Sequence, residues 1–348
     1  MFAHQILEKF WSGQSVLLIA EVGINHNGDL DLARQSIESA ARAGVDAVKF
    51  QNYRTEDFIS DRTLTYEYIS QGKTVVESQF DMFKRCELPR AWLPVLKEIC
   101  DQNNVLFLST PMGKDGLDDL IQLGVPMLKN GSDCLQHISL IQGMAKSGLP
   151  TLISTGMATL EDINEAVTAY REAGGKDLVL MHCTSAYPTP PKDVNLKKIQ
   201  ALAKVFDCPV GFSDHSAGII ATLGAVALGA RIIEKHFTLD RNLPGPDHRF
   251  SSDPEEWRQL VVAVRELEAC LGSDRIVPTA SEDHGRNQFR LSCVAARALP
   301  AGHSLTEADI AFRRPGNGLA PGEVSKLIGR KLLAPIESGY LFRLEHLG

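Results

Sequence analysis

Two histidines stand in equivalent places in consecutive short apolar segments. His215 closes the segment Pro209–His215, and His236 is next to last in the segment Arg231–Phe237. If the segments form neighbouring parallel strands, the two imidazoles share one edge and lie within reach of one ion. A metal ion bound by two protein nitrogens keeps coordination positions for water and substrate oxygen, which suits manganese or magnesium better than structural zinc. The spacing leaves open the alternative of two histidines that only make hydrogen bonds.

Cationic and hydroxyl side chains occupy the ends of other apolar segments. Ammonium and hydroxyl donors gathered at one rim suit the oxygens of phosphate and carboxylate groups, so a small dianion is the expected ligand. The alternative is that the hydroxyl residues only finish strands and that the lysines are solvated. The residues are Lys49, Lys129, Thr110, Ser132, Ser154 and Ser213.

Two carboxylates stand near the same ends. Glu21 precedes the polar turn Gly-Ile-Asn-His-Asn-Gly at 23–28, where it can contact a polyol or act as an acid or base. Asp247 ends the turn Pro-Gly-Pro-Asp at 244–247, which would hold it above the expected metal. The alternative is that this Pro-Gly motif is an ordinary turn without a function.

Eight short apolar segments must position these residues, and each is followed by an amphipathic, helix-like stretch. This alternation predicts an α/β protein built on a (β/α)8 TIM barrel, in which chemistry collects at the C-terminal ends of the strands. The expected strands are Val16–Gly23, Asp46–Gln51, Val105–Pro111, Met127–Ser132, Thr151–Met157, Leu178–Ser185, Pro209–His215 and Arg231–Phe237. The expected helices are Asp29–Gly44, Leu88–Asn104, Lys114–Gly124, His137–Gly148, Thr159–Gly174, Asn195–Phe206, Ala217–Gly229 and Asp253–Gly272.

Strand alternation assigns side chains to faces, because residues two apart share a face. Asp214 and Lys235 are charged residues at positions that otherwise carry outward-facing apolar side chains. We expect them to pair with each other. The pairs expected to face the barrel mouth are Lys49 with Gln51, His182 with Thr184, Ser213 with His215, and Glu234 with His236. The residues expected to face the outer helices are Val48, Phe50, Cys183, Phe212 and Ile233.

The remaining segments predict an active-site wall and a second domain. The stretch Asn52–Glu87 is longer than an ordinary connector and should cover the barrel mouth. After Gly272 the chain is rich in charged residues and shows no regular periodicity. It then contains short β-like segments separated by Gly and Pro residues. We therefore expect a catalytic barrel at 1–272, a linker at 273–290 and a small domain at 291–348.

Composition excludes several classes of protein. Hydrophobic residues make up 44% and charged residues 23% of the chain, as in ordinary globular proteins, and no apolar run is long enough to cross a membrane. A net charge of −7 without a basic run gives no reason to expect nucleic acid binding. The 7 dispersed cysteines fit neither a disulfide framework nor structural zinc. The N-terminus lacks a secretory signal pattern, so we expect a cytoplasmic protein.

Taken in order, the motifs resemble the sialic acid (N-acetylneuraminate) synthase family. The resemblance extends from about Leu17 to the C-terminus, where residues 291–348 are similar to the antifreeze-like SAF (β-clip) domain of that family. The motifs are Glu21-Val-Gly-Ile-Asn-His-Asn-Gly28, Lys49-Phe-Gln51, Ser109-Thr-Pro111, Ser154-Thr-Gly-Met157, His182-Cys-Thr-Ser-Ala-Tyr-Pro-Thr-Pro190, Gly211-Phe-Ser-Asp-His215, Glu234-Lys-His-Phe-Thr238, Pro244-Gly-Pro-Asp247 and Arg314-Pro-Gly-Asn-Gly318.

The resemblance implies condensation of phosphoenolpyruvate with an N-acetylmannosamine-type sugar, which gives a nine-carbon 3-deoxy-2-keto acid and phosphate. It implies that His215 and His236 bind Mn²⁺ or Mg²⁺, which polarises the sugar aldehyde, and that the lysines and hydroxyl residues hold the anion. The catalytic residues implied are Glu21, Lys49, His215, His236 and Asp247. The substrate-binding residues implied are Gln51, Thr110, Lys129, Ser132, Ser154, Ser185, Tyr187, Ser213 and Arg314.

The resemblance also implies a domain-swapped homodimer. In such a dimer Arg314 reaches the acyl-amino group of the sugar bound by the partner subunit. From the residues alone, an Arg-Arg-Pro-Gly turn at 313–316 is only a solvated loop.

Two positions depart from the family pattern. Ser132-Asp133-Cys134 stands where the family has Ser-x-Glu, whose carboxylate is a candidate for managing the attacking water, and Ser185 replaces an Asn. Asp133 is one position earlier than that Glu, which on a strand would turn it elsewhere. The acceptor sugar stays open among N-acetylmannosamine and the precursors of legionaminic and pseudaminic acid. The alternatives are a metal-dependent pyruvate aldolase and a catalytically inactive homologue that acts as a binding protein.

Overall fold

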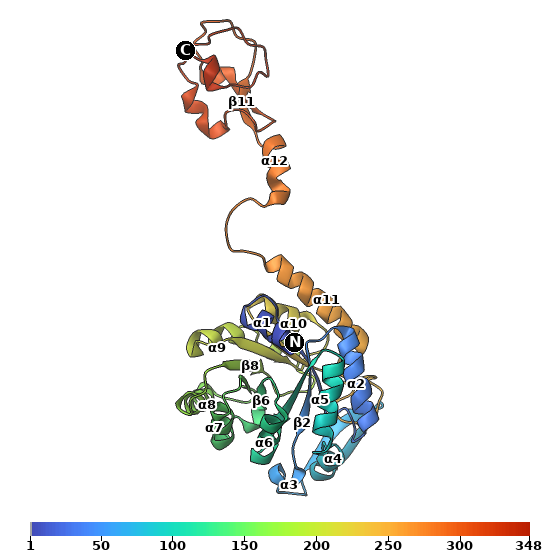
Figure 1. Cartoon of the computed structure of the whole chain (residues 1–348). Coiled ribbons are helices and arrows are strands. Elements are labelled where there is room, and N and C mark those ends of the chain that lie inside the picture. Colours follow the sequence, from blue (N-terminus) through green and yellow to red (C-terminus); the bar gives the residue numbers. More distant parts are fainter. Residues whose placement is uncertain (1) are drawn as a thin grey trace. The chain divides into compact units, whose positions relative to one another are not determined.

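The computed structural model describes residues 2–348, which divide into two compact units with the boundary between Gly272 and Ser273 (Figure 1). The first unit contains an 8-stranded parallel sheet in the order β5-β2-β1-β10-β9-β8-β7-β6. Its two end strands, β5 and β6, lie next to each other, so the sheet forms a nearly closed barrel. The predicted (β/α)8 barrel is confirmed.

The barrel strands are short apolar runs that are buried on both faces, as expected for parallel strands covered by helices. Three end two or three residues before the predicted bound: β6 ends at Asn130, β7 at Ser154 and β8 at Cys183. Ser132 therefore lies in the 3-10 turn η1 (Ser132–Cys134) and not at a strand end. The strands are β1 (Leu17–Gly23), β2 (Ala47–Asn52), β5 (Leu106–Pro111), β6 (Leu128–Asn130), β7 (Thr151–Ser154), β8 (Leu178–Cys183), β9 (Val210–Asp214) and β10 (Ile232–His236).

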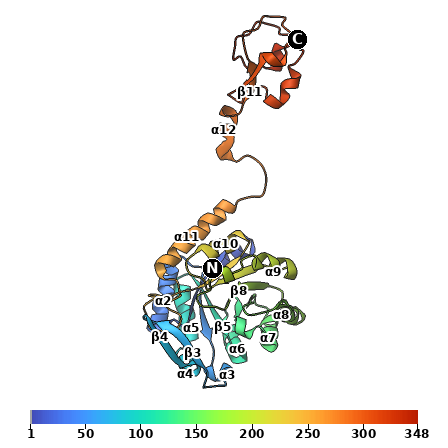
Figure 2. The same cartoon turned by 180° about the vertical axis from the view of Figure 1, so that it is seen from behind.

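Each strand is followed by a helix at the predicted place, and the helices ring the barrel in Figures 1 and 2. Gly44, with φ +92°, closes α2 in the left-handed conformation that glycine adopts without strain. The helices are α2 (Leu30–Ala43), α5 (Trp92–Gln102), α6 (Lys114–Leu123), α7 (Ile138–Lys146), α8 (Leu160–Glu172), α9 (Lys198–Phe206), α10 (Ile220–Ala227) and α11 (Pro254–Leu271).

Two layers of apolar side chains stabilise the barrel. An inner cluster that includes Leu17, Ile19 and Met181 fills its interior, and a larger outer cluster packs the strands against the helices. Helix α1 (Phe2–Trp11), which the sequence analysis did not anticipate, packs Phe2 and Ile6 against the inner cluster. In the views of Figures 1 and 2 it lies at the end of the barrel away from α3. One end of the barrel is thus closed by α1.

The long connection after β2 forms an added substructure. It contains α3 (Thr55–Phe58), the antiparallel hairpin of β3 (Thr65–Ser70) and β4 (Lys73–Ser78), and α4 (Gln79–Arg85). Ser70 and Gln71 fasten the hairpin to the loop after β10: the Gly245 amide donates to Ser70 Oγ at 3.1 Å, and Gln71 Nε2 donates to the Asn242 carbonyl at 3.2 Å.

The second unit has a separate core. Strands β11 (Ser292–Ala295) and β12 (Ile310–Arg313) pair in antiparallel fashion, and Cys293, Leu305 and Phe342 belong to its own apolar cluster. Two short helices, η3 (Ala280–Glu282) and α12 (Asp283–Gln288), lie within the segment 273–290. Among residues 2–348, no helix combines the length and apolarity needed to cross a lipid bilayer.

Candidate active site

A cavity of about 670 Å³ opens at the C-terminal ends of the barrel strands. Tyr66, Gln79, Met82 and Phe83 from the connection after β2 also line it, so this segment does form a wall of the barrel mouth, as predicted. The sequence-predicted site residues that line the cavity are Glu21, Lys49, Gln51, Thr110, Lys129, Ser132, Ser154, Ser185, Tyr187, Ser213, His215, His236 and Asp247.

Two buried lysines and two buried carboxylates alternate in the cavity floor. Lys49 Nζ lies 2.9 Å from Glu21 Oε2, and the ammonium groups of Lys49 and Lys129 each lie 3.8 Å from Glu234 Oε1. Burial lowers the pKa of Lys129, whereas at Lys49 burial is outweighed by Glu21 and Glu234, which raise the pKa of that ammonium. Burial raises the pKa of Glu21. Because the four charges balance, the floor is held without a counter-ion from solvent.

Hydroxyl groups surround the lysines. Lys49 Nζ donates to Thr110 Oγ1 at 2.9 Å, and Lys129 Nζ donates to Ser154 Oγ at 2.6 Å. Ser213 Oγ donates to Glu234 Oε1 at 3.1 Å. These contacts fix the lysines at the strand ends with remaining N–H and O–H donors available to an anionic ligand.

The two histidines meet as expected from their places on β9 and β10, with ring centroids 5.4 Å apart. His215 Nδ1 lies 2.9 Å from the Thr184 carbonyl oxygen, and a proton on Nδ1 leaves the Nε2 lone pair free. Among residues 2–348, His236 Nδ1 is a buried nitrogen without a hydrogen-bond partner. Burial, together with the charge that His215 carries when it is protonated, lowers the pKa of His236 well below its ordinary value. A neutral ring with an unpartnered nitrogen is what a metal requires.

The protein part of such a metal site is incomplete. Within residues 2–348, no three or more His, Cys, Asp or Glu side chains are grouped so that they could hold a metal ion. Asp247 Oδ2 lies 3.7 Å from His236 Nδ1, and burial raises the pKa of this carboxyl to about 7. The residues therefore fit a divalent ion that takes two ring nitrogens from the protein and its other ligands from water or substrate.

The turn η1 places Asp133 in the cavity. Asp133 lines it, and Gly131 leaves room for the Asp133 carboxylate because any side chain at 131 would collide with it. Cys134, by contrast, packs against the outer apolar cluster. The expectation that Asp133 turns elsewhere is wrong, because the residue stands in a 3-10 turn in which strand alternation does not apply.

The predicted faces of β8 are also wrong. Cys183 lines the cavity, with Sγ 3.9 Å from His215 Nδ1, whereas His182 turns outward, where its Nε2 lies 2.6 Å from the Val194 carbonyl oxygen. Met181 belongs to the inner cluster, which fixes 181 and 183 on the inward face. The Val194 carbonyl that satisfies His182 lies in a loop, and no local sequence signal indicates that contact.

Other faces were predicted correctly. Val48, Phe50, Phe212 and Ile233 belong to the outer apolar cluster. Lys235 Nζ lies 3.0 Å from Asp214 Oδ2, so the expected pairing of these two outward charges is confirmed. Asp133, Cys183 and Glu234 line the cavity but were not among the assigned site residues, although strand alternation had already placed Glu234 inward.

The other predicted substrate-binding residues of the barrel lie beside this charged floor. Gln51 Nε2 donates to Glu21 Oε1 at 3.0 Å, and the ring of Tyr187 lies 4.3 Å from that of His215. Gly156 allows the hydroxyl groups of Ser132 and Ser185 to approach its backbone, where Ser132 Oγ accepts from the Gly156 amide at 3.0 Å. Arg314 belongs to the second unit, where it is exposed and its guanidinium lies 5.1 Å from the centre of the Phe289 ring.

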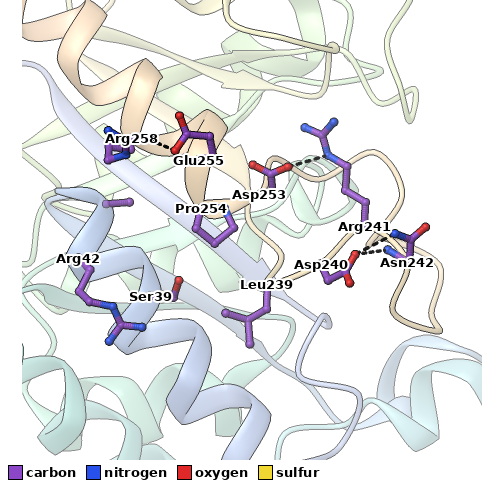
Figure 3. Close-up of a pocket in the computed structure, with 11 residues that line it drawn as sticks. Ser39, Arg42, Leu239, Asp240, Arg241, Asn242, Asp253, Pro254, Glu255 and Arg258 are labelled. Carbon is purple, nitrogen blue, oxygen red and sulfur yellow. Dashed lines mark hydrogen bonds and ion pairs between the residues drawn. The ribbon is translucent and has the colours of Figure 1, made fainter.

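Another pocket, of about 600 Å³, lies on the outside of the barrel between α2 and the start of α11 (Figure 3). Its charges largely pair with one another: Arg241 Nε lies 3.8 Å from Asp253 Oδ2, and Arg258 pairs with Glu255. It contains none of the strand-end lysines and histidines. The cavity at the strand ends is therefore the candidate active site.

Comparison with known proteins gives the family. The chain belongs to the NeuB family, whose sequence profile matches residues 36–275, and a SAF domain profile matches residues 292–348. This confirms the resemblance of both regions.

The relatives include synthases of legionaminic, pseudaminic and neuraminic acids. The chain is 38% identical over 340 residues to the N,N'-diacetyllegionaminic acid synthase of Legionella pneumophila, covering 97% of this chain and 96% of the relative. It is 36% identical to the N-acetylneuraminate-9-phosphate synthase of Drosophila melanogaster, covering 91% of this chain and 92% of that protein. A solved N-acetylneuraminic acid synthetase from Leptospira borgpetersenii, in complex with citrate, is 36% identical, with a TM-score of 0.71 over 78% of this chain and 90% of the other.

Proposed function

We propose that this protein condenses phosphoenolpyruvate with an N-acetylmannosamine-type sugar to a nine-carbon 3-deoxy-2-keto acid, with release of phosphate. The observation that carries the proposal is the grouping of two buried lysines, several hydroxyl groups and two histidines in one cavity at the strand ends. The relatives, which are synthases of acidic sugars of this kind, support the same reaction.

The anion-binding part would consist of the two lysines and the hydroxyl groups. Lys49 and Lys129 provide charge-assisted hydrogen bonds to the phosphate and carboxylate of phosphoenolpyruvate. Thr110 and Ser154, which accept from the two lysines, fix the ammonium groups and keep their own O–H donors, and Ser132 adds another hydroxyl donor. Ser213 would turn its hydroxyl from Glu234 to the anion. The fixed charge stabilises the transition state without reorganisation of solvent.

The sugar would lie on the side of the histidines. Glu21, Gln51 and Asp247 offer polar groups to its hydroxyl groups, and Tyr187 and Ser185 lie next to them in the cavity wall. His215 and His236 would hold Mn²⁺ or Mg²⁺, which would supply Lewis-acid polarisation of the sugar aldehyde.

The carbon–carbon bond would form between C3 of phosphoenolpyruvate and the aldehyde carbon of the open-chain sugar. The carbonyl π electrons pass to the aldehyde oxygen, which becomes a hydroxyl group with the proton that the attacking water gives up. Water then adds to the cationic C2, and the tetrahedral intermediate expels phosphate as its C–O bond breaks. We propose that the Asp133 carboxylate accepts the proton of this water, since it faces the cavity that holds both lysines while Cys134 does not.

We further propose that Arg314 completes the sugar site of a partner subunit in a domain-swapped homodimer. Its exposed guanidinium provides donors suited to an acyl-amino oxygen. The basis for this proposal is the family motif Arg314-Pro-Gly-Asn-Gly318 within the SAF domain.

One experiment tests the reaction as a whole. The protein is incubated with Mn²⁺, a panel of 2-acetamido sugars and either phosphoenolpyruvate or pyruvate, and phosphate and product mass are measured. Phosphate release together with a product of the mass of the keto acid is the expected result. Product formation from pyruvate without phosphate would indicate an aldolase, and absence of product from every combination would indicate a binding protein.

A further inference from the structure

A second chamber of about 340 Å³ adjoins the candidate active site. It shares Tyr66, Tyr187 and Pro246 with the reaction cavity. We propose that this chamber receives the end of the acceptor sugar remote from its aldehyde and selects a neutral sugar with an apolar substituent there, such as a methyl or acetamido group. The inference rests on the proposed function and names the substrate class of that site.

Two of the segments that form the walls of the chamber are tied together. One is the β3–β4 hairpin and the other is the loop after β10, and Ser70 and Gln71 join them through the two hydrogen bonds described above. The ring of Phe250, in that loop, lies 5.0 Å from the ring of His236. The chamber thus begins beside the proposed reaction centre, within the length of an extended sugar.

The lining is rich in aromatic surface. The rings of Tyr66 and Tyr68 are stacked with centroids 5.9 Å apart, and Phe250 lies 5.2 Å from Tyr187. Ile69 adds an aliphatic side chain from the same hairpin. Such surface favours methyl groups and the C–H faces of a sugar over hydroxyl groups, which would lose hydrogen bonds to water on entry.

The charges of the chamber disfavour a phosphorylated sugar. Arg241 pairs with Glu256 and Asp253, and its Nε donates to the Ser251 carbonyl at 2.9 Å. Arg249 is exposed to solvent, and Glu67 lines the same chamber. Neither Arg241 nor Arg249 is a buried cation, as Lys129 is in the reaction cavity, so a phosphate dianion gains little from these solvent-exposed charges.

The test compares three acceptors at saturating phosphoenolpyruvate: N-acetylmannosamine, its 6-phosphate and 2,4-diacetamido-2,4,6-trideoxymannose. Because one added apolar group in a fitting pocket changes kcat/KM by about 10-fold or more, we expect the diacetamido sugar to exceed both others by at least about 10-fold. The variant Ile69→Lys places a cation in the chamber. Val205→Lys is the control, because Val205 is an exposed apolar residue of α9 that lines neither cavity.

Ile69→Lys is expected to shrink the ratio of kcat/KM for the diacetamido sugar over the 6-phosphate by about 10-fold, a change typical of one charge-assisted contact, while Val205→Lys leaves it unchanged. A wild-type preference for the 6-phosphate would overturn the chamber proposal. So would equal ratios in the two variants, provided that both retain the wild-type melting temperature. Absence of phosphate release with all three sugars would instead overturn the proposed function, and the chamber proposal with it.

Discussion

The ammonium group of Lys129 donates to the hydroxyl oxygen of Ser154 at 2.6 Å, and both side chains are buried at the ends of adjacent strands. The bond holds a cation whose pKa is lowered by burial at a fixed point of the cavity. An anionic substrate that reaches this point meets the oriented ammonium donor of Lys129. Loss of this donor should therefore affect phosphoenolpyruvate and not the neutral sugar.

Lys129→Met is expected to raise the KM for phosphoenolpyruvate by about 10-fold or more, because one charge-assisted hydrogen bond to the anion is lost. The KM for the sugar should change little. Lys146→Met, which removes an exposed lysine, is the control. Initial rates of phosphate release at varied concentrations of each substrate check this, and equal effects on the two KM values would contradict the assignment.

His215→Ala and His236→Ala are each expected to abolish turnover and to weaken Mn²⁺ binding, because two protein nitrogens are reduced to one. The fold should persist, since the barrel core lies below these side chains. His4→Ala removes a histidine whose side chain is 84% exposed and serves as the control. Titration with Mn²⁺ gives the affinity independently of the rate, and wild-type affinity in both variants would rule out the metal assignment.

Asp133→Asn is expected to lower kcat by about 100-fold, the range for loss of a general base, with little effect on the KM for phosphoenolpyruvate. Cys134→Ala should retain nearly wild-type kcat, because that side chain packs outside the cavity. Single-turnover phosphate release measures both. If Cys134→Ala were the more damaging change, the proposed role of Asp133 would be refuted.

Arg314→Ala is expected to lower kcat/KM for the sugar while dimer mass and Mn²⁺ binding stay unchanged. A mixed dimer of a His236→Ala subunit with an Arg314→Ala subunit tests the swap. If the arginine acts on the partner subunit, one barrel in the mixed dimer is intact and about half of the wild-type activity returns. No recovery would show that each subunit supplies its own arginine.

The second unit should lose stability in acid. Asp309 is buried and accepts hydrogen bonds from His303, Thr306 and Arg297, which hold the pKa of this carboxyl well below its usual range. Because the folded pKa lies below the unfolded one, the stabilisation is present above about pH 4 and declines as the pH falls towards the folded pKa.

Asp309→Asn should therefore destabilise this unit at neutral pH by about 1–3 kcal/mol and flatten its response to acid. Calorimetry of the full chain between pH 7 and 3 measures the transition, with the exposed Asp283→Asn as control. An unchanged acid response in Asp309→Asn would show that other groups carry it.

Sequence periodicity was sufficient for the barrel, because buried parallel strands and amphipathic helices leave different repeats. Strand alternation also placed correctly the cavity residues that belong to regular strands, such as Lys49 and Glu234. It failed at Asp133 and Cys183, where a 3-10 turn and a distant loop carbonyl decide which side chain faces inward. Helix α1 was missed because it is stabilised by packing against the inner cluster, a tertiary contact that the local sequence does not show.

The β3–β4 hairpin lies wholly within the single connection between β2 and α5. Its residues can therefore change, lengthen or shorten without moving any strand that carries the lysines and histidines. If this hairpin walls the acceptor sugar as proposed, evolution of one insertion is enough to change the acceptor while the residues that hold phosphoenolpyruvate stay in place.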